Sequence, residues 1–252
     1  FNNATNLAGA AFLLASSHRN NINLRLVSAQ DIDIHHGLAI FGEKPTGPEQ
    51  YRRICGLAPS TLTYLQECYA SLVELDASEF GHNLDTDSQK LLKRSINGNG
   101  SLFLTLRMRK VRPGGQSPIW HLVPWDGREF WKQWFGAEMS ADGHRHIMSS
   151  WLRQHCKASL VETQLGHNAA MSLFDECGVV APAEFAHSIS EALEKFLEVF
   201  GIAAGQGKRE GGGKRWRVNH ADSIEIAKVI NLEGNLLNKD DKRLQVPSKR
   251  KA

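Results

Sequence analysis

The pattern of hydrophobic and polar residues predicts a helix near the start of the chain and a small antiparallel sheet after it. Residues 7–15 are almost uniformly apolar and indicate a helix. Residues 31–34 alternate polar and apolar positions, as a strand with one buried face does, and residues 38–41 form a second apolar strand. The turn His35-His36-Gly37 separates the two strands, and a loop with two glycines and two prolines follows at residues 42–48.

A long helix and a second hairpin are expected next. Apolar side chains recur at helical spacing from Leu62 to Leu75, and Ser60 is the expected N-cap of this helix. Residues 76–100 are polar and indicate a turn or a surface insertion. The apolar runs 102–106 and 120–123 flank a basic, glycine-containing arm and predict a hairpin.

The chain is expected to be helical from Ser140 onward. Residues 146–165 indicate one or two helices, and residues 186–200 place apolar side chains on one face of an amphipathic helix. Gly201 is positioned to end that helix. The order helix, short strands, helices, hairpin and helices predicts the α+β class, a mostly helical domain with a small antiparallel sheet.

Composition narrows the class of protein. The 252 residues are 41% hydrophobic and 23% charged, which is ordinary for globular domains and excludes collagen-like and disordered chains. The four cysteines lie far apart, so neither a disulfide framework nor a structural zinc site is expected, and a reducing cytosol fits. No apolar run approaches the roughly 20 residues that span a bilayer. Because the chain begins at Phe1, we expect a fragment that lacks an N-terminal domain.

Charge is distributed unevenly. The net charge is only +3, but residues 201–252 hold 12 basic and 6 acidic side chains, whereas the first 200 hold 18 and 21. Residues 205–213 contain five glycines and are expected to form a flexible hinge before this basic tail. Such a tail favours polyanions through release of counterions, although a merely solvated tail has the same composition.

Three short segments share a resemblance to one enzyme family. Residues 143–152 read Gly-His-Arg-His-Ile-Met-Ser-Ser-Trp-Leu, and residues 165–168 read Leu-Gly-His-Asn. Upstream, residues 12–24 combine an apolar helix, a small-residue turn and an arginine, and a strand follows them. In this order the segments resemble the three conserved boxes of the tyrosine recombinase (phage integrase) family. The hairpin lysine of that family then corresponds most simply to Lys44.

The resemblance covers residues 5–70 and 138–200 and implies an architecture and a function. It implies a catalytic domain at 1–204 with an insertion at about 76–125, followed by the hinge and basic segment at 205–252. The implied activity is site-specific recombination: cleavage and rejoining of double-stranded DNA through a covalent 3′-phosphotyrosine, without metal or nucleotide. The implied assembly is a tetramer on paired DNA sites of a mobile genetic element, in the cytoplasm with the nucleoid.

The chemistry of this reaction explains the residue types. Attack on a phosphodiester builds negative charge on two oxygens, which the arginine pair Arg19 and Arg145 could clamp through bidentate bonds. A lysine with a lowered pKa, here Lys44, could protonate the departing 5′ oxygen. His167 could bond a phosphate oxygen or take the proton of the nucleophile. The rivals of Lys44 for the hairpin role are Arg52, Arg53 and Lys110.

Two departures from the family pattern affect the prediction. Asp142 stands where the family usually has histidine, three residues before the second arginine, and His144 is the alternative for that role. The three tyrosines, Tyr51, Tyr64 and Tyr69, all precede His167, whereas the family's nucleophile follows this histidine by about nine residues.

Phe174 is therefore the predicted stand-in for the nucleophilic tyrosine. It lacks only the hydroxyl group, although it comes seven residues after the histidine and Glu176 is the residue at nine. Cys177 is a poor substitute because its acidic neighbours raise the pKa of its thiol. The chain as given is thus expected not to cleave DNA.

Further contacts with DNA are expected from basic side chains outside the boxes. They are Arg107, Arg109, Lys110, Arg112, Lys214, Arg215 and Arg217. The histidine pairs lack a third ligand at suitable spacing, so no metal site is expected. Two other functions stay open: a catalytically inactive DNA-binding relative of the recombinases, and an unrelated α+β interaction domain.

Overall fold

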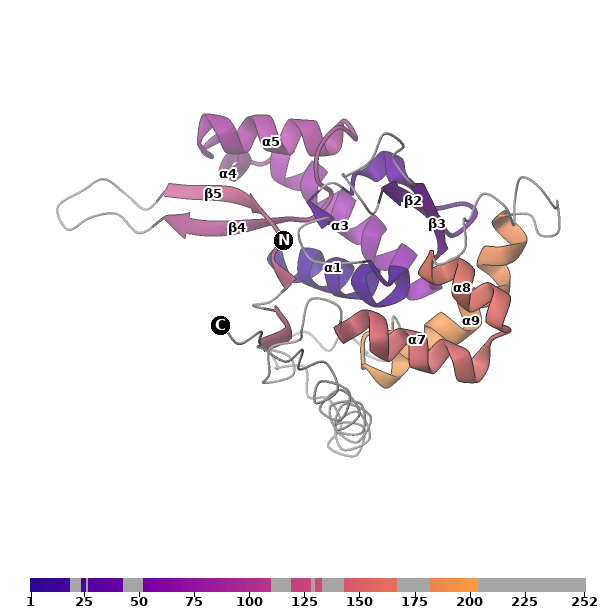
Figure 1. Ribbon diagram of the computed structural model, residues 1–252. Coiled ribbons are helices and arrows are strands. Elements are labelled where there is room, and N and C mark those ends of the chain that lie inside the picture. Colours follow the sequence, from indigo (N-terminus) through magenta and orange to yellow (C-terminus); the bar gives the residue numbers. More distant parts are fainter. Residues whose placement is uncertain are drawn as a thin grey trace, which may run out of the picture.

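The computed structural model of the protein describes residues 1–18, 24–25, 27–42, 52–109, 119–127, 130–132, 143–166 and 182–203. Its helices are η1 (Ala29–Asp31), α1 (Asn2–Ser16), α3 (Pro59–Ala77), α4 (Glu79–His82), α5 (Thr86–Ile96), α7 (Gly143–His155), α8 (Ala158–Leu165) and α9 (Pro182–Val199). Its strands are β1 (Ile32–Asp33), β2 (Leu38–Gly42), β3 (Arg52–Gly56), β4 (Leu104–Arg109) and β5 (Ile119–Pro124). The predicted α+β class with a small antiparallel sheet is confirmed (Figure 1).

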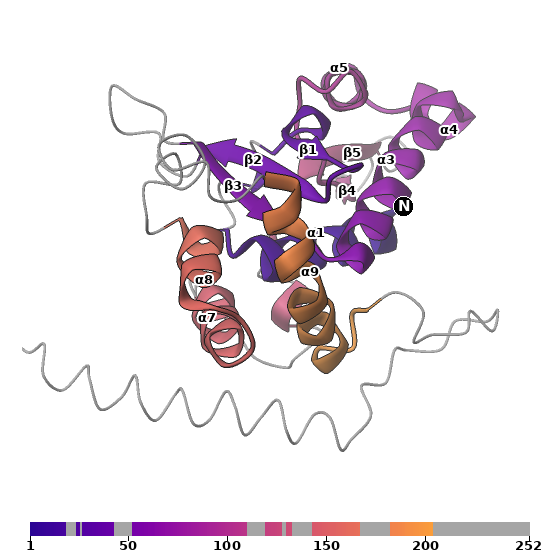
Figure 2. The same cartoon turned by 90° about the vertical axis from the view of Figure 1, so that its right-hand side faces the viewer.

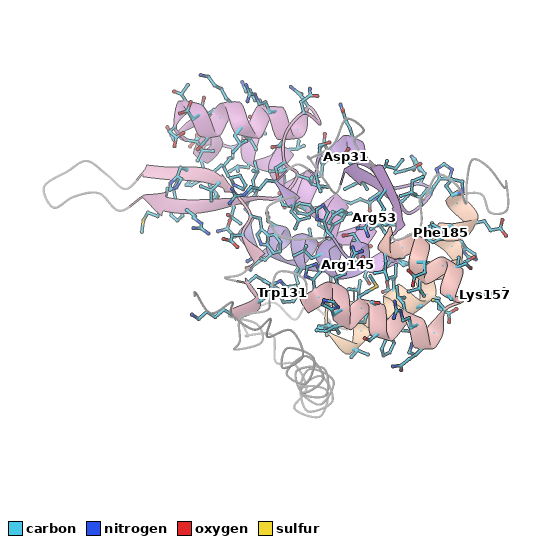
Figure 3. The ribbon with its side chains drawn as sticks, in the orientation of Figure 1. Asp31, Arg53, Trp131, Arg145, Lys157 and Phe185 are labelled. Carbon is cyan, nitrogen blue, oxygen red and sulfur yellow. The ribbon has the colours of Figure 1, made fainter. Side chains whose placement is uncertain are left out.

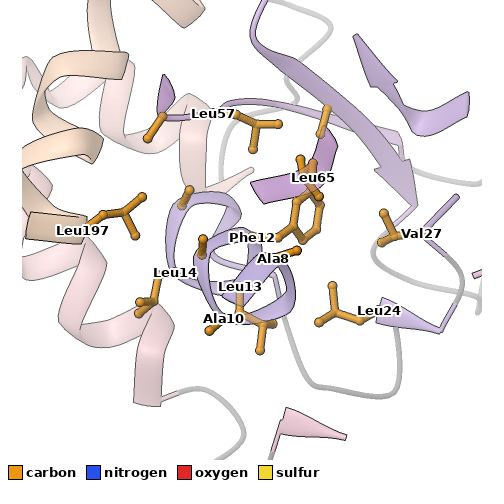
Figure 4. Packing of buried hydrophobic residues seen from close by; sticks show 14 of the residues in the cluster. Ala8, Ala10, Phe12, Leu13, Leu14, Leu24, Val27, Leu57, Leu65 and Leu197 are labelled. Carbon is orange, nitrogen blue, oxygen red and sulfur yellow. The ribbon is translucent and has the colours of Figure 1, made fainter. Parts of the chain in front are cut away.

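Helix α1 forms the centre of the core. Its apolar run is buried on nearly every side, as a helix that is hydrophobic all round must be. Figure 4 shows Phe12, Leu13 and Leu14 surrounded by side chains of several other elements. The indole of Trp125 lies so close to Gly9 that a Cβ there would come within 2.9 Å of the ring. Only a glycine at this position lets the indole pack directly on the helix backbone.

The three-stranded sheet has the order β1-β2-β3, with both pairs antiparallel. Strands β2 and β3 form a hairpin whose last paired residues are Gly42 and Arg52. At the other end of the hairpin, Gly56 packs against α9, where a Cβ would come within 2.5 Å of Ile189. Helix α9 therefore lies directly on β3, and it fills this place with the apolar face that the sequence pattern predicts.

The segment predicted as a polar turn or insertion, residues 76–100, is instead mostly helical. Asp85 caps α5 by accepting a hydrogen bond of 2.7 Å from the amide of Ser88. Leu92 of α5 is buried, and the helix packs on α3 and β5. The described part of residues 76–125 thus shares the main core, and β4 and β5 form the second predicted hairpin.

The expected N-cap at Ser60 is wrong. Helix α3 begins two residues earlier than that cap implies, with Pro59 as its first residue and Ala58 as the cap residue. Ser60 instead binds Glu194 of α9: its amide donates to Oε2 at 2.9 Å, and its hydroxyl donates to Oε1. A carboxylate from a distant helix therefore takes the place of a local cap.

Helices α7, α8 and α9 pack together beside α1 and the three-stranded sheet (Figure 2). Two helices, α7 and α8, occupy the region 146–165, as expected. The Trp151 indole of α7 donates a hydrogen bond of 3.1 Å to the main-chain oxygen of Ala192 in α9. Within the described ranges, no helix is both long and apolar enough to cross a membrane.

Candidate functional site

A buried polar junction lies where the end of α1, strand β3, the start of α7 and the end of α8 meet. We call it the arginine junction, and its members are Ser16, Ser17, His18, Arg53, His144, Arg145, Gln164 and Leu165. Figure 3 shows its two arginines, Arg53 and Arg145, close together in the middle of the molecule. Both are almost fully buried, with exposed fractions of 3% and 7%. Buried charges are rare in proteins unless hydrogen bonds compensate for the lost hydration.

Arg53 of β3 joins the ends of two helices. Its Nη2 donates to the main-chain oxygen of Ser16 at 2.7 Å, and its Nη1 donates to the main-chain oxygen of Gln164 at 2.8 Å. The Ser17 hydroxyl lies 3.2 Å from the same Nη1. The last carbonyl groups of a helix have no partner within the helix, so a guanidinium group is well suited to satisfy them.

Arg145, in the first turn of α7, binds the same two helix ends from the other side. Its Nη1 donates to the main-chain oxygen of Ser17 at 3.0 Å, and its Nη2 donates to that of Leu165. These acceptors are main-chain oxygens, and the two bonds fix the orientation of the guanidinium group. The next residue back, His144, places its Nε2 2.6 Å from the main-chain oxygen of His18. Because a carbonyl oxygen only accepts, this Nε2 carries the proton.

Gln164 completes the connection between α8 and the sheet. Its Nε2 donates to the main-chain oxygens of Ala15 and Gly56 at 2.7 and 2.9 Å, and its Oε1 accepts from the Gly56 amide at 2.8 Å. The side chain is fully buried and satisfies polar main-chain groups of both α1 and β3.

Two left-handed residues end the helices that meet here. Ser17 follows α1 with φ of 48°, and Gly166 follows α8 with φ of 66°. Glycine adopts this conformation without steric cost, whereas in serine the Cβ comes close to the following carbonyl oxygen and raises the energy. At Gly166 space is a second constraint, because a Cβ would come within 2.4 Å of the Cδ of Arg53. The Leu-Gly-His segment thus needs glycine for both conformation and packing.

Most residues of the predicted catalytic set lie outside the described residues. Arg19, Lys44, His167 and Phe174 are in this group, as is Asp142. Of the set, the structure describes Arg145, together with the alternative residue His144. Two of these residues directly follow members or neighbours of the junction in sequence: Arg19 follows His18, and His167 follows Gly166. Lys44 follows the end of β2 by two residues.

The structure describes little of the predicted DNA-contacting set. Arg107 is exposed on β4, and Arg109 is the last residue of that strand, with its side chain outside the described part. The other five members also lie outside the described residues: Lys110, Arg112, Lys214, Arg215 and Arg217. The hinge predicted at 205–213 and the basic tail that follows it also lie outside the described residues.

The sequence interpretation missed two central members of the junction. The sequence pattern indicates Arg53 only as a rival of Lys44 for the hairpin role, and it gives no indication of Gln164. One signal was present: Arg53 lies in a strand among Ile54 and Cys55, where an arginine must either be exposed or find buried partners. Its partners lie 36, 37 and 111 residues away in the chain, so no local pattern identifies them.

In the described part of the chain, no group of three His, Cys, Asp or Glu side chains is placed to hold a metal ion.

Comparisons with protein-family models, with curated proteins and with solved structures find no match to this chain.

Proposed function

We propose that this chain is the catalytic domain of a DNA strand-exchange protein of the tyrosine recombinase type, and that as given it lacks the nucleophile. One observation carries the proposal. Arg53 and Arg145 tie together the end of α1, the end of α8 and the hairpin strand β3. The chain continues from the end of α1 to Arg19 and from the end of α8 to His167, and Lys44 follows β2, the strand that pairs with β3. The described segments next to Arg19 and His167 are far apart in sequence, and they meet at one point beside β3.

The proposed reaction begins with a phosphate held by the arginines. Arg19 and Arg145 clamp the non-bridging oxygens, and the hydrogen bond from Arg145 to Ser17 also holds the chain before Arg19 in place. Charge stabilisation by a fixed guanidinium group is strong where water is excluded. The proposed partners are duplex DNA and further copies of the chain.

In an active form, a tyrosine oxygen attacks phosphorus, and the bond from phosphorus to the 5′ oxygen breaks. The tyrosine proton passes to His167, and Lys44 gives its proton to the departing 5′ oxygen. A later attack by a 5′ hydroxyl reverses these steps and rejoins a strand. The phenyl ring of Phe174 has no oxygen, so the chain as given binds the phosphate and stops there.

A second candidate function is a DNA-binding relative that has lost cleavage altogether. The sequence favours it in one respect, since no tyrosine follows Tyr69. The two functions share the phosphate site and differ only in whether a restored hydroxyl group can react.

The test is covalent capture of DNA. Phe174→Tyr, Glu176→Tyr and the control Phe174→Leu are mixed with a pool of nicked duplexes with randomised sequence around the nick, and SDS-resistant protein–DNA adducts are measured. The proposal expects an adduct with Phe174→Tyr, and its loss when Arg19→Ala is added.

The other outcomes are equally informative. An adduct with Glu176→Tyr alone supports the function but moves the nucleophile to the family's usual spacing. An adduct formed by the unchanged chain shows another nucleophile, such as Cys177, and contradicts the assignment of Phe174. Duplex binding without an adduct from either tyrosine variant supports the inactive relative.

A further inference from the structure

The hairpin of β4 and β5 is held firmly at its base and extends beyond it. At the Leu106–Leu122 pair, Asn2 of α1 binds Leu106 twice, accepting from its amide at 2.7 Å and donating to its oxygen at 3.0 Å. On the other strand, the Leu122 amide donates to the Ser88 hydroxyl of α5 at 2.8 Å. Figure 1 shows β4 and β5 side by side beneath α4 and α5, with their outer ends pointing away from the body of the molecule. We call residues 107–109 and 119–121 the outer ribbon.

The outer ribbon lies in a strongly basic segment. From Leu104 to Pro124 the sequence contains four arginines and lysines and no aspartate or glutamate. Arg107, the first residue of β4 beyond the Leu106–Leu122 pair, is exposed and is paired with His121 of β5. Asp126, just after this segment, lines the same pocket as Arg107 at the base of the hairpin. The segment itself carries only positive charge, and a projecting basic segment is complementary in charge to a polyanion.

The two faces of the ribbon differ in chemistry. Successive strand residues point to opposite faces, so Met108 and Trp120, which are paired across the strands, lie opposite to Arg107. The Trp120 ring packs edge to face on Phe80 of α4, with centroids 5.9 Å apart. This contact supports the ribbon on its apolar face, beyond the Leu106–Leu122 pair.

We propose that the outer ribbon enters the major groove of duplex DNA and presents its Arg107 face to the base edges. The inference rests on the proposed function, because that function supplies duplex DNA as the partner, and it adds a surface that recognises sequence. The major groove is wide enough to admit a two-stranded antiparallel ribbon, and arginine pairs with guanine through two hydrogen bonds. Anchors on both strands give the ribbon the fixed orientation that such recognition requires.

The positive charge of the Arg107 face favours DNA over a protein as the partner of the outer ribbon. The apolar face, with Met108 53% and Trp120 37% exposed, is the part that a protein partner would cover. Binding of DNA through the Arg107 face leaves that surface uninvolved. A DNA partner would therefore contact residue 107, and a protein partner would contact residue 108, which is adjacent in sequence.

The experiment measures affinity and sequence preference together. Protein is equilibrated with a pool of duplexes of random sequence, bound DNA is sequenced, and affinity is then measured on the preferred duplex over a range of salt concentrations. We compare the unchanged chain with Arg107→Ala, with Arg107→Lys and with the matched control Met108→Ala. Thermal melting checks that each variant is folded.

We expect Arg107→Ala to weaken binding to the preferred duplex by about 5-fold to about 150-fold and to erase the preference at one or two adjacent base pairs. Arg107→Lys keeps the charge but not the bidentate pairing, so it should keep the salt dependence and lose the same preference. Met108→Ala should leave both affinity and preference unchanged.

Several results would overturn the inference. If Arg107→Ala and Arg107→Lys keep the sequence preference of the unchanged chain, Arg107 does not contact bases. This holds also if affinity falls equally for all sequences and the log–log salt slope falls by about one, since that result indicates a phosphate contact. A loss with Met108→Ala as large as that with Arg107→Ala assigns the DNA contact to the apolar face. If the unchanged chain binds no duplex at all, the proposed function fails together with the ribbon. If the arginine variants bind duplex DNA with unaltered sequence preference, the inference about the outer ribbon is wrong and the proposed function is unaffected.

Discussion

The Nη1 of Arg145 donates a hydrogen bond of 3.0 Å to the main-chain oxygen of Ser17, a residue 128 positions earlier in the chain. The same guanidinium group binds the oxygen of Leu165 at the end of α8. One side chain thus sets the distance between the segments that lead to Arg19 and His167. An arginine at this position thus acts as a connector between helix ends.

The first prediction concerns Arg145→Lys. A lysine has a single nitrogen and cannot reach both carbonyl oxygens, so one buried acceptor stays unsatisfied, at a cost of about 1–3 kcal/mol. Arg153→Lys is the matched control on the same helix, because Arg153 is exposed and pairs with Glu162 at 3.3 Å. Its effect should stay within about 0.5 kcal/mol. Urea unfolding measures both, and equal small losses would show that the junction bonds contribute little.

The second prediction separates conformation from space at Gly166. Gly166 and Gly201 both have φ of 66°, but a Cβ at Gly201 meets no atom within 4 Å, whereas at Gly166 it meets Arg53. Gly201→Ala should therefore cost only the backbone term of about 1–2 kcal/mol. Gly166→Ala should cost about 1–3 kcal/mol more from the overlap.

A double-mutant cycle on Gly166→Ala and Arg53→Ala tests the source of that difference. Removing the arginine side chain removes the overlap, so the two substitutions should be strongly non-additive in urea unfolding. Additive losses would place the cost of Gly166→Ala in the backbone alone.

The third prediction concerns the carboxylate at the start of α3. Glu194→Ala removes the acceptor of the Ser60 amide and hydroxyl and should lower the free energy of unfolding by about 1–2 kcal/mol. Glu191→Ala, on the same helix, removes only an exposed ion pair with Lys195 and should leave the free energy of unfolding nearly unchanged. A similar small loss in both variants would mean that water replaces Glu194 at no cost.

Periodic elements of the fold could be predicted from the sequence, and elements that depend on distant partners could not. The amphipathic face of α9 and the apolar run of α1 predict those helices because each pattern reports burial directly. Helix α5 was missed because its mean composition is polar and few of its side chains, such as Leu92, are buried. Its local signals are the cap at Asp85 and the helical spacing of Leu91, Leu92 and Ile96 among polar residues.

The start of α3 shows the same division. The Ala58-Pro59 dipeptide is a local signal for a helix beginning at proline, and it was outweighed by the capping preference of serine. The actual role of Ser60 depends on Glu194, 134 residues away, which no local pattern contains. Arg145 was singled out by resemblance, but its bonds to two helix ends could be seen only in the folded chain.

The last prediction uses the buried thiol of Cys68. This residue is fully buried between α1 and the segment before β4, with its sulfur 3.9 Å from the Thr5 hydroxyl and 3.6 Å from the Leu102 oxygen. Loss of hydration raises the pKa of the thiol from 9.0 to about 11 in the folded protein.

A raised pKa in the folded state has a defined sign for stability. Below pH about 9 the thiol is protonated in both states and stability is unaffected by its titration. Between about 9 and about 11 the unfolded chain loses the proton while the folded chain keeps it, so the free energy of unfolding falls as pH rises. The slope from this one group reaches about 1.4 kcal/mol per pH unit.

Comparison with Cys68→Ala isolates this contribution from the other groups that titrate in alkali. The variant should be less stable at about pH 8 because it loses packing, and its disadvantage should shrink between about pH 9 and about pH 11. Urea unfolding at a series of pH values measures the difference between the two proteins. Cys156→Ala is the control, because Cys156 is only half-buried and the rise in the pKa of its thiol is smaller. A difference between the protein and Cys68→Ala that is constant with pH would show that the thiol is ionised as easily in the folded state as in the unfolded state.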